Sequence, residues 1–242
     1  IGMVEIKKIA NVLREELSKQ ADPVARQGMQ RYFKEPVKCY GFKSPVLKEI
    51  AKRHWNESVS GLDKASFFNL CENLLANDYF EEAYLVIDWL PKFWKQYTLS
   101  DLVLFEKWID RYVNNWAKCD GFCSHTIRRF LTKFPEGKDR VKGWKDCYNI
   151  WMKRAAAVSF VPFARKGIYI KDAFEIADTL LEHPHDMVQK GYGWLLKEVS
   201  KAHQEAVFNY VVQKKNKMPR TALRYAIEKM PPALRAEAMK KG

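Results

Sequence analysis

The segment Lys153-Arg154-Ala155-Ala156 introduces a pattern that returns twice, as Gln189-Lys190-Gly191 and as Arg220-Thr221-Ala222. Each copy places a long polar or basic residue before a small one, early in an expected helix. The basic residues of successive copies are 36 and 30 residues apart. A helix pair repeated at about 30–45 residues predicts an α-solenoid, whose stacked pairs form an extended concave face. The alternative is three unrelated amphipathic helices, because many helices begin alike.

Helical periodicity extends through the whole chain, and alternating strand patterns are scarce. Ser44, Asp63, Ser100, Asn149 and Asp186 are expected N-caps, because their short polar side chains accept hydrogen bonds from a first helical turn. Pro91 is expected to kink or break its helix. The expected helices cover residues 3–19, 24–33, 46–55, 64–75, 80–94, 102–113, about 115–134, 150–164, 171–181, 187–201, 205–214 and 220–229. The sequence therefore predicts an all-α protein.

The positive charge is concentrated in the second half. The 242 residues include 42 Lys and Arg against 29 Asp and Glu, which gives a net charge of +13. Residues 1–120 hold 18 of the basic and 17 of the acidic residues, so nearly all the excess lies beyond residue 120. Such asymmetry favours a surface that faces nucleic acid, or an anionic membrane, over one charged only for solubility.

Several classes of protein lose support. No apolar stretch approaches the roughly 20 residues of a membrane helix, and no signal-peptide pattern is present. The chain lacks phosphate-binding, dinucleotide-binding, zinc-protease and hydrolase motifs. Cys119, Cys123 and His125 lie close together without a CxxC pair, so buried cysteines are expected and no metal or other cofactor. The five cysteines are interpreted as reduced thiols in a cytoplasmic protein, associated with the nucleoid if it is bacterial.

Two positions could support chemistry. Trp116 and Asp120 are four apart and therefore share a helix face, and Gly121 leaves room for a close approach. Asp120 could act on a substrate or form an ordinary ion pair with Arg154. Trp194 follows two helical glycines, each costing about 1 kcal/mol relative to Ala. It could be a core residue or an exposed aromatic residue beside a groove.

The sequence resembles the DNA alkylation repair proteins of the AlkD type, most strongly from about residue 80 onward. The shared landmarks are Trp116-x3-Asp120, Trp151-Met152-Lys153-Arg154-Ala155-Ala156 and Val188-Gln189-Lys190-Gly191-Tyr192-Gly193-Trp194. The resemblance implies a single domain over residues 1–242, built of HEAT-like antiparallel helix pairs in a C-shaped solenoid. Its basic concave face would hold duplex DNA.

The same resemblance implies excision of cationic alkylpurines such as 3-methyladenine and 7-methylguanine. Asp120 would be the catalytic carboxylate, Trp116 and Trp194 the aromatic walls, and Arg154 a groove residue beside them. The other basic residues expected to grip phosphates of duplex DNA are Lys153, Lys190, Arg220 and Arg224. The protein is expected to act as a monomer. Some relatives only bind DNA, so a non-catalytic protein for branched or damaged DNA is the alternative.

Overall fold

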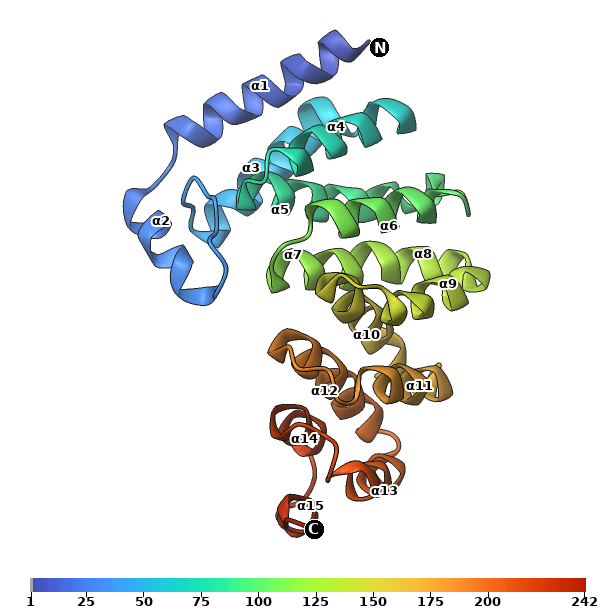
Figure 1. Ribbon diagram of the computed structural model, residues 1–242. Coiled ribbons are helices and arrows are strands. Elements are labelled where there is room, and N and C mark those ends of the chain that lie inside the picture. The colour runs from blue at the N-terminus through green and yellow to red at the C-terminus, as the bar shows by residue number, and fades with distance from the viewer. Residues whose placement is uncertain (1) are drawn as a thin grey trace. The chain divides into compact units, whose positions relative to one another are not determined.

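Every regular element between residues 2 and 242 of the computed structural model is a helix, and these are the residues that the structure describes (Figure 1). This confirms the all-α prediction. The chain forms two compact units, an N-terminal unit up to Gly121 and a C-terminal unit, Phe122–Gly242. The boundary falls beside the position where the excess of basic residues begins. Within the described residues, no helix is both long enough and apolar enough to cross a membrane.

The N-terminal unit consists of helices of 3 to 17 residues, and its longest connection is the loop over residues 33–43. Its elements are α1 (Met3–Lys19), α2 (Pro23–Met29), η1 (Gln30–Tyr32), α3 (Ser44–His54), η2 (Trp55–Val59), α4 (Lys64–Ala76), α5 (Phe80–Trp89), η3 (Leu90–Gln96), α6 (Asp101–Tyr112) and α7 (Trp116–Gly121). These bounds follow the sequence prediction within a few residues. Helix α5 ends just before Pro91, where the chain tightens into the 3₁₀ helix η3, as the missing proline N–H requires.

Aromatic packing holds this unit together. Phe67 and Phe93 stack with ring centroids 3.9 Å apart, which joins α4 to η3. Trp89 is fully buried and donates its indole N–H to the carbonyl of Ala51 over 2.9 Å, which fixes α5 against α3. Asp63 caps α4 as predicted, since its carboxylate accepts from the backbone N–H of Ser66.

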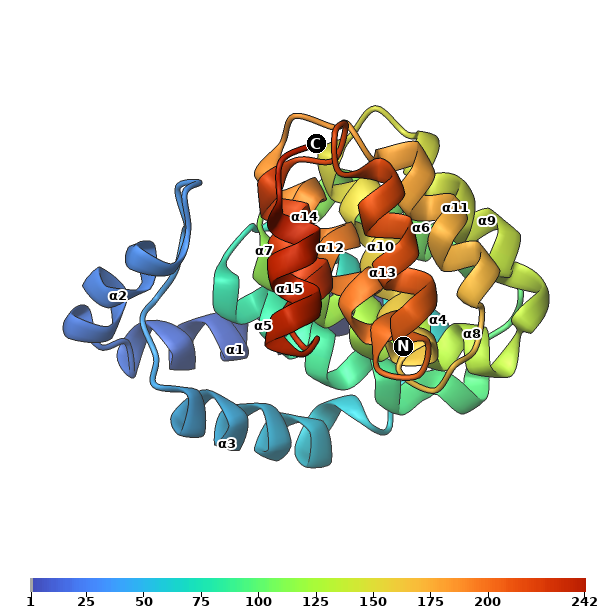
Figure 2. The ribbon, with the colours of Figure 1, turned by 90° about the horizontal axis from the view of Figure 1, so that it is seen from below.

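The C-terminal unit continues the helical succession. Its elements are η4 (Phe122–Ile127), α8 (Arg128–Lys133), η5 (Pro135–Gly137), α9 (Lys138–Gly143), η6 (Trp144–Asp146), α10 (Ile150–Ala164), α11 (Ile170–Leu180), α12 (Asp186–Ser200), α13 (Gln204–Lys214), α14 (Arg220–Ile227) and α15 (Pro232–Met239). Within this unit α10, α12 and α14 pack in succession as one layer, and α11 and α13 form a second layer beside it (Figures 1 and 2). This is the stacked arrangement of an α-solenoid.

The repeated small residues let the helices of the first layer approach closely. A Cβ atom on Gly193 of α12 would lie 2.9 Å from the carbonyl oxygen of Ala222 and 2.8 Å from Cβ of Tyr225, both on α14. A Cβ atom on Gly191 would lie 3.3 Å from Cγ of Arg154 on α10. The glycines therefore mark close helix contacts, and the three sequence copies occupy one packed layer.

Ion pairs tie α9 to α11. The Lys142 ammonium lies 2.9 Å from Asp172 and 2.6 Å from Glu175, and the hydrogen bonds that it donates to Glu175 and Asp172 raise the pKa of Lys142. Burial alone would raise the pKa of Asp172, but hydrogen bonds from Lys142 and Lys138 outweigh it and lower that pKa. Both partners are therefore ionised at neutral pH.

Some local predictions were wrong. The N-cap of α12 is His185, whose ring Nδ1 accepts from the N–H of Met187, and not Asp186, which begins the helix. Likewise Ser44 is the first residue of α3 and not its cap, and Ser100 precedes α6 without a capping side-chain hydrogen bond. The short helices α9 and α15 were not predicted, because proline and glycine flank or begin them and obscure their periodicity.

Replacing Gly193 by alanine tests the close contact of α12 with α14. The added methyl group would meet a backbone carbonyl that cannot rotate away, so Gly193→Ala should lower the free energy of unfolding by about 1–3 kcal/mol. Gly143→Ala is the matched control, because a Cβ there meets nothing within 4 Å. Urea denaturation followed by circular dichroism measures both; equal stability of the two variants would contradict the close contact.

Candidate functional site

The predicted site residues divide between the two units. Trp116 and Asp120 belong to α7 in the N-terminal unit. The others belong to the helices of the α10, α12 and α14 layer: Lys153, Arg154, Lys190, Trp194, Arg220 and Arg224. Each unit therefore contributes one set of candidate residues, an aromatic residue with a carboxylate in the first and a row of cations with Trp194 in the second.

Helix α7 begins with a side-chain cap. Asn115 is 2% exposed, and its amide oxygen accepts from the backbone N–H of Lys118 over 3.0 Å. This bond starts the helix at Trp116, so that Asp120 follows one turn later on the same face. Asp120 is half-buried. A Cβ on Gly121 would lie 3.0 Å from Cγ2 of Ile87, so this glycine allows close packing of α7 on α5.

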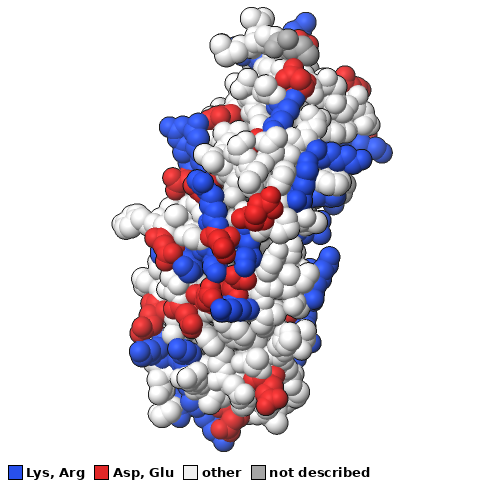
Figure 3. Space-filling view, turned by 90° about the vertical axis from the view of Figure 1, so that its right-hand side faces the viewer, with Lys and Arg blue, Asp and Glu red and all other residues white. Residues whose placement is uncertain are grey.

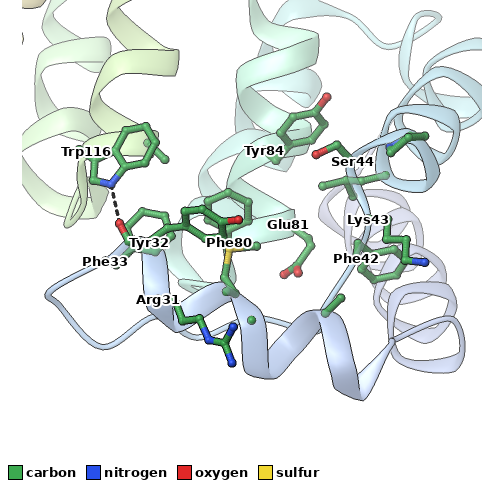
Figure 4. A pocket seen from close by; sticks show the side chains of 16 residues that line it. Arg31, Tyr32, Phe33, Phe42, Lys43, Ser44, Phe80, Glu81, Tyr84 and Trp116 are labelled. Carbon is green, nitrogen blue, oxygen red and sulfur yellow. Dashed lines mark hydrogen bonds between the residues drawn. The ribbon is translucent and has the colours of Figure 1, made fainter.

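Trp116 is held at its edge and open on part of its surface. Its indole N–H donates to the carbonyl of Tyr32 over 3.0 Å, and its ring stacks on Phe33 with centroids 5.5 Å apart (Figure 4). The side chain remains 37% exposed. Tyr32 beside it is 70% exposed, a second accessible ring that sequence patterns did not single out. The site thus offers a fixed aromatic surface near a carboxylate.

Lys118 anchors the opposite side of α7. Its side chain is 5% exposed, and its ammonium lies 2.7 Å from the Asp78 carboxylate and 3.0 Å from the Asn114 amide oxygen. Asn114 also donates to Asp78, which adopts a left-handed backbone with φ of 61°. The charge of Lys118 is therefore compensated locally, and this lysine positions α7 rather than adding to a basic surface around Asp120.

Arg154 lies between α10 and α12. It is 6% exposed, and its guanidinium donates to the carbonyl of Met187 over 2.7 Å, at the start of α12. Gly191 provides the space for its aliphatic stem. Trp194 is half-buried, one turn beyond Lys190 on α12. The sequence did not predict this contact of Arg154 with α12, because no local pattern reports which helices pack together.

The other cations of this layer have varied partners. The Lys153 ammonium donates to the carbonyl of Lys145 over 3.0 Å, and an Arg220 guanidinium nitrogen donates to the carbonyl of Met239 over 3.1 Å. Lys190 lies 3.5 Å from Asp186, whereas Arg224 is exposed and has no carboxylate partner within residues 2–242. Carbonyl partners are neutral, so they orient Lys153 and Arg220 without cancelling their charge.

The two layers of the C-terminal unit differ in charge. Helices α10, α12 and α14 contain six basic and two acidic residues, whereas α11 and α13 contain two basic and four acidic residues. The view in Figure 3 faces the side on which α11 and α13 lie, and there blue and red side chains are interspersed. The excess positive charge of these helices therefore belongs to the α10, α12 and α14 layer.

The cysteines form no metal centre in the described part of the chain. Cys119 and Cys123 are both fully buried, as expected of small apolar residues. Nowhere in residues 2–242 do three His, Cys, Asp or Glu side chains gather closely enough to hold a metal ion.

The structure is therefore that of an all-helical repeat protein. It has a cationic helix layer in one unit and a tryptophan–carboxylate pair in the other. A family model described as DNA alkylation repair enzyme matches residues 13–230, so the chain belongs to the DNA alkylation repair family. The match spans most of both units and contains every predicted site residue. A comparison with curated proteins finds no match.

A solved structure described as a predicted DNA alkylation repair enzyme from Enterococcus faecalis has a similar fold. It superposes with a TM-score of 0.79 at 17% sequence identity, covering 88% of this chain and 98% of the other. At this identity the likeness supports the fold alone. This likeness confirms the predicted helical-repeat fold, and the family model confirms the resemblance to the family.

The cap of α7 is open to a direct test. Asn115→Ala removes the oxygen that accepts from the Lys118 N–H and should destabilise the helix by about 1 kcal/mol, while Asn115→Ser should retain most of the cap. Hydrogen exchange of the peptide covering α7 measures the change. We expect faster exchange, about fivefold, in the alanine variant only. Unchanged exchange in Asn115→Ala would show that the cap does not hold α7.

Proposed function

We propose that the protein is a monofunctional DNA glycosylase that excises cationic N-alkylated purines, of the 3-methyladenine and 7-methylguanine type, from duplex DNA. The observation that carries this proposal is the Trp116 and Asp120 pair on α7 in a member of the DNA alkylation repair family. The enzyme would be a monomer whose whole chain, residues 1–242, forms one functional domain. It would need no cofactor. It would reside in the cytoplasm or nucleoid, where genomic DNA is.

Excision of a cationic base requires only one catalytic carboxylate. An N-alkylated purine already carries a positive charge, so it leaves with the electron pair of the C1′–N bond and needs no general acid. Cation character then develops on the deoxyribose, as in glycoside hydrolysis. Asp120 would stabilise this charge and orient the attacking water, whose oxygen bonds to C1′ while its proton passes to solvent. The products are the neutral base and an abasic site.

The aromatic residues would recognise the cationic nucleotide. An indole face attracts a cation by about 0.5–2 kcal/mol, and this attraction strengthens where water is excluded. Trp116 is suited to this role because its ring is fixed by Tyr32 and Phe33 while part of its surface stays accessible. Trp194, half-buried on α12, is proposed as the second aromatic contact.

The cationic layer would bind the phosphates. Arg154, Lys153, Lys190, Arg220 and Arg224 all lie on α10, α12 or α14, the helix layer in which six basic residues face only two acidic ones. Phosphate contacts position a protein on DNA without reading its sequence. That suits an enzyme that must find lesions in any sequence.

Asp120→Asn separates catalysis from binding. The amide is nearly isosteric but carries no charge, so release of 7-methylguanine should fall about 10²-fold or more while duplex binding is nearly unchanged. Mass spectrometry of released bases, with fluorescence anisotropy for binding, measures both. Asp110→Asn, an exposed carboxylate on α6, is the control and should retain activity.

Full activity of Asp120→Asn would overturn the mechanism. Absence of base release by the wild-type protein, together with tight binding to junctions, would instead identify a non-catalytic protein for branched or damaged DNA.

Arg224→Gln tests the cationic layer. Loss of one phosphate contact should reduce the slope of log affinity against log salt by about 1. Lys171→Gln is the matched control, because Lys171 is an exposed cation on α11, in the other layer. Titration of duplex DNA at several salt concentrations should leave the slope of the control unchanged. If Lys171→Gln reduced the salt slope more than Arg224→Gln did, the DNA would bind to the α11 and α13 layer, which would contradict the proposal.

A further inference from the structure

A cavity with a volume of about 630 Å³ lies in the N-terminal unit between α2, the start of α3, α5 and α7 (Figure 4). Six aromatic side chains line it: Tyr32, Phe33, Phe42, Phe80, Tyr84 and Trp116. Phe33 stacks on Trp116, and its ring centroid lies 6.0 Å from that of Phe80. The walls are therefore planar π surfaces, which suit a flat aromatic ligand.

Helix α2 lines the cavity but contributes no buried side chain to the hydrophobic core. The helix lies at the margin of the N-terminal unit, next to the end of α1 (Figures 1 and 2), and none of its residues is buried. Ala25, Gly28 and Met29 line the cavity, at the spacing of one helix face. A Cβ on Gly28 would meet nothing within 4 Å. The small residues of α2 thus leave the space unfilled.

The cavity lining includes two exposed cations. Lys43 and Arg31 border it, and neither has a carboxylate partner among the described residues. The one carboxylate in the lining, Glu81, is fully buried, and its oxygens accept from the backbone N–H groups of Tyr40 and Gly41. Glu81 therefore holds the loop before α3, and the accessible charge of the lining is positive.

We infer that this cavity binds one unstacked nucleotide, with its base among Phe33, Phe80 and Trp116 and its phosphate at Lys43 and Arg31. Base–aromatic stacking tolerates any base, because every base has a π face. The inference rests on the proposed function in taking DNA as the partner, and it adds a site for an unpaired nucleotide beside the helix that carries Asp120. The same chemistry would accept a free nucleotide.

Photo-crosslinking tests the site directly. A duplex with a single bulged 5-iodo-2′-deoxyuridine is irradiated with the full-length protein, and the crosslinked peptide is identified by mass spectrometry. Crosslinks to Tyr32, Phe33, Phe80 or Trp116 are expected, and free dUMP in excess should not suppress them if the site serves DNA. Suppression at micromolar dUMP would identify a free-nucleotide site. Crosslinks confined to residues outside the cavity would overturn the inference.

A cavity-filling variant provides the second measurement. Gly28→Phe should fill the space from α2, lower crosslinking and remove a preference for bulged over fully paired duplex, which we expect to be about tenfold. Gly143→Phe is the matched control, since a Cβ there also meets nothing within 4 Å and α9 lies in the other unit. Equal bulge preference in wild type and Gly28→Phe would contradict the site.

These readouts need no lesion, so they remain interpretable if the protein releases no alkylated base. Conversely, base release that depends on Asp120 but is accompanied by no crosslink in the cavity would support the proposed function and reject this site.

Discussion

The close approach of α12 to α14 is the constraint on which the C-terminal unit depends. At Gly193 the facing atom is the carbonyl oxygen of Ala222, 2.9 Å from where a Cβ would stand, so only glycine fits without a shift. At Gly191 the absence of a side chain likewise leaves space for the Arg154 side chain. Small residues thus bring α10, α12 and α14 into one layer. The long basic residues that precede these small residues in the sequence lie on the same layer. Packing and charge distribution have one origin in the sequence.

In the N-terminal unit, the equivalent constraint is the anchoring of α7, the first six residues of a helical stretch that continues without a break into η4 and α8. Helix α7 is fixed by the Asn115 cap, by buried Lys118 on Asp78, and by the Trp116 indole on the Tyr32 carbonyl. The cap is local, whereas the other two bonds reach the segment before α5 and the end of η1. Trp116 and Asp120 consequently lie at a helix start whose position is set by hydrogen bonds and an ion pair, as a pre-organised site requires.

Much of the fold was predictable because its signals are local. The periodicity of α1, the cap at Asp63 and the break at Pro91 each depend on a few neighbouring residues. The pairing of Lys118 with Asp78, 40 residues away, was not predictable, because no local pattern reports a tertiary ion pair. The exposure of Tyr32 and the cavity beneath α2 were missed for the same reason. Site residues were identified through family landmarks, and their roles in catalysis and DNA binding stay predictions.

Isotope tracing is the most direct test of whether this protein hydrolyses a glycosidic bond. Duplex DNA containing 7-methylguanine would be incubated with the wild-type protein in H₂¹⁸O, and both products analysed by mass spectrometry. We expect free 7-methylguanine without label and an abasic sugar, trapped by reduction as it forms, that carries one ¹⁸O at C1′. Guanine restored within an intact strand, or no release of the methylated base, would contradict this expectation.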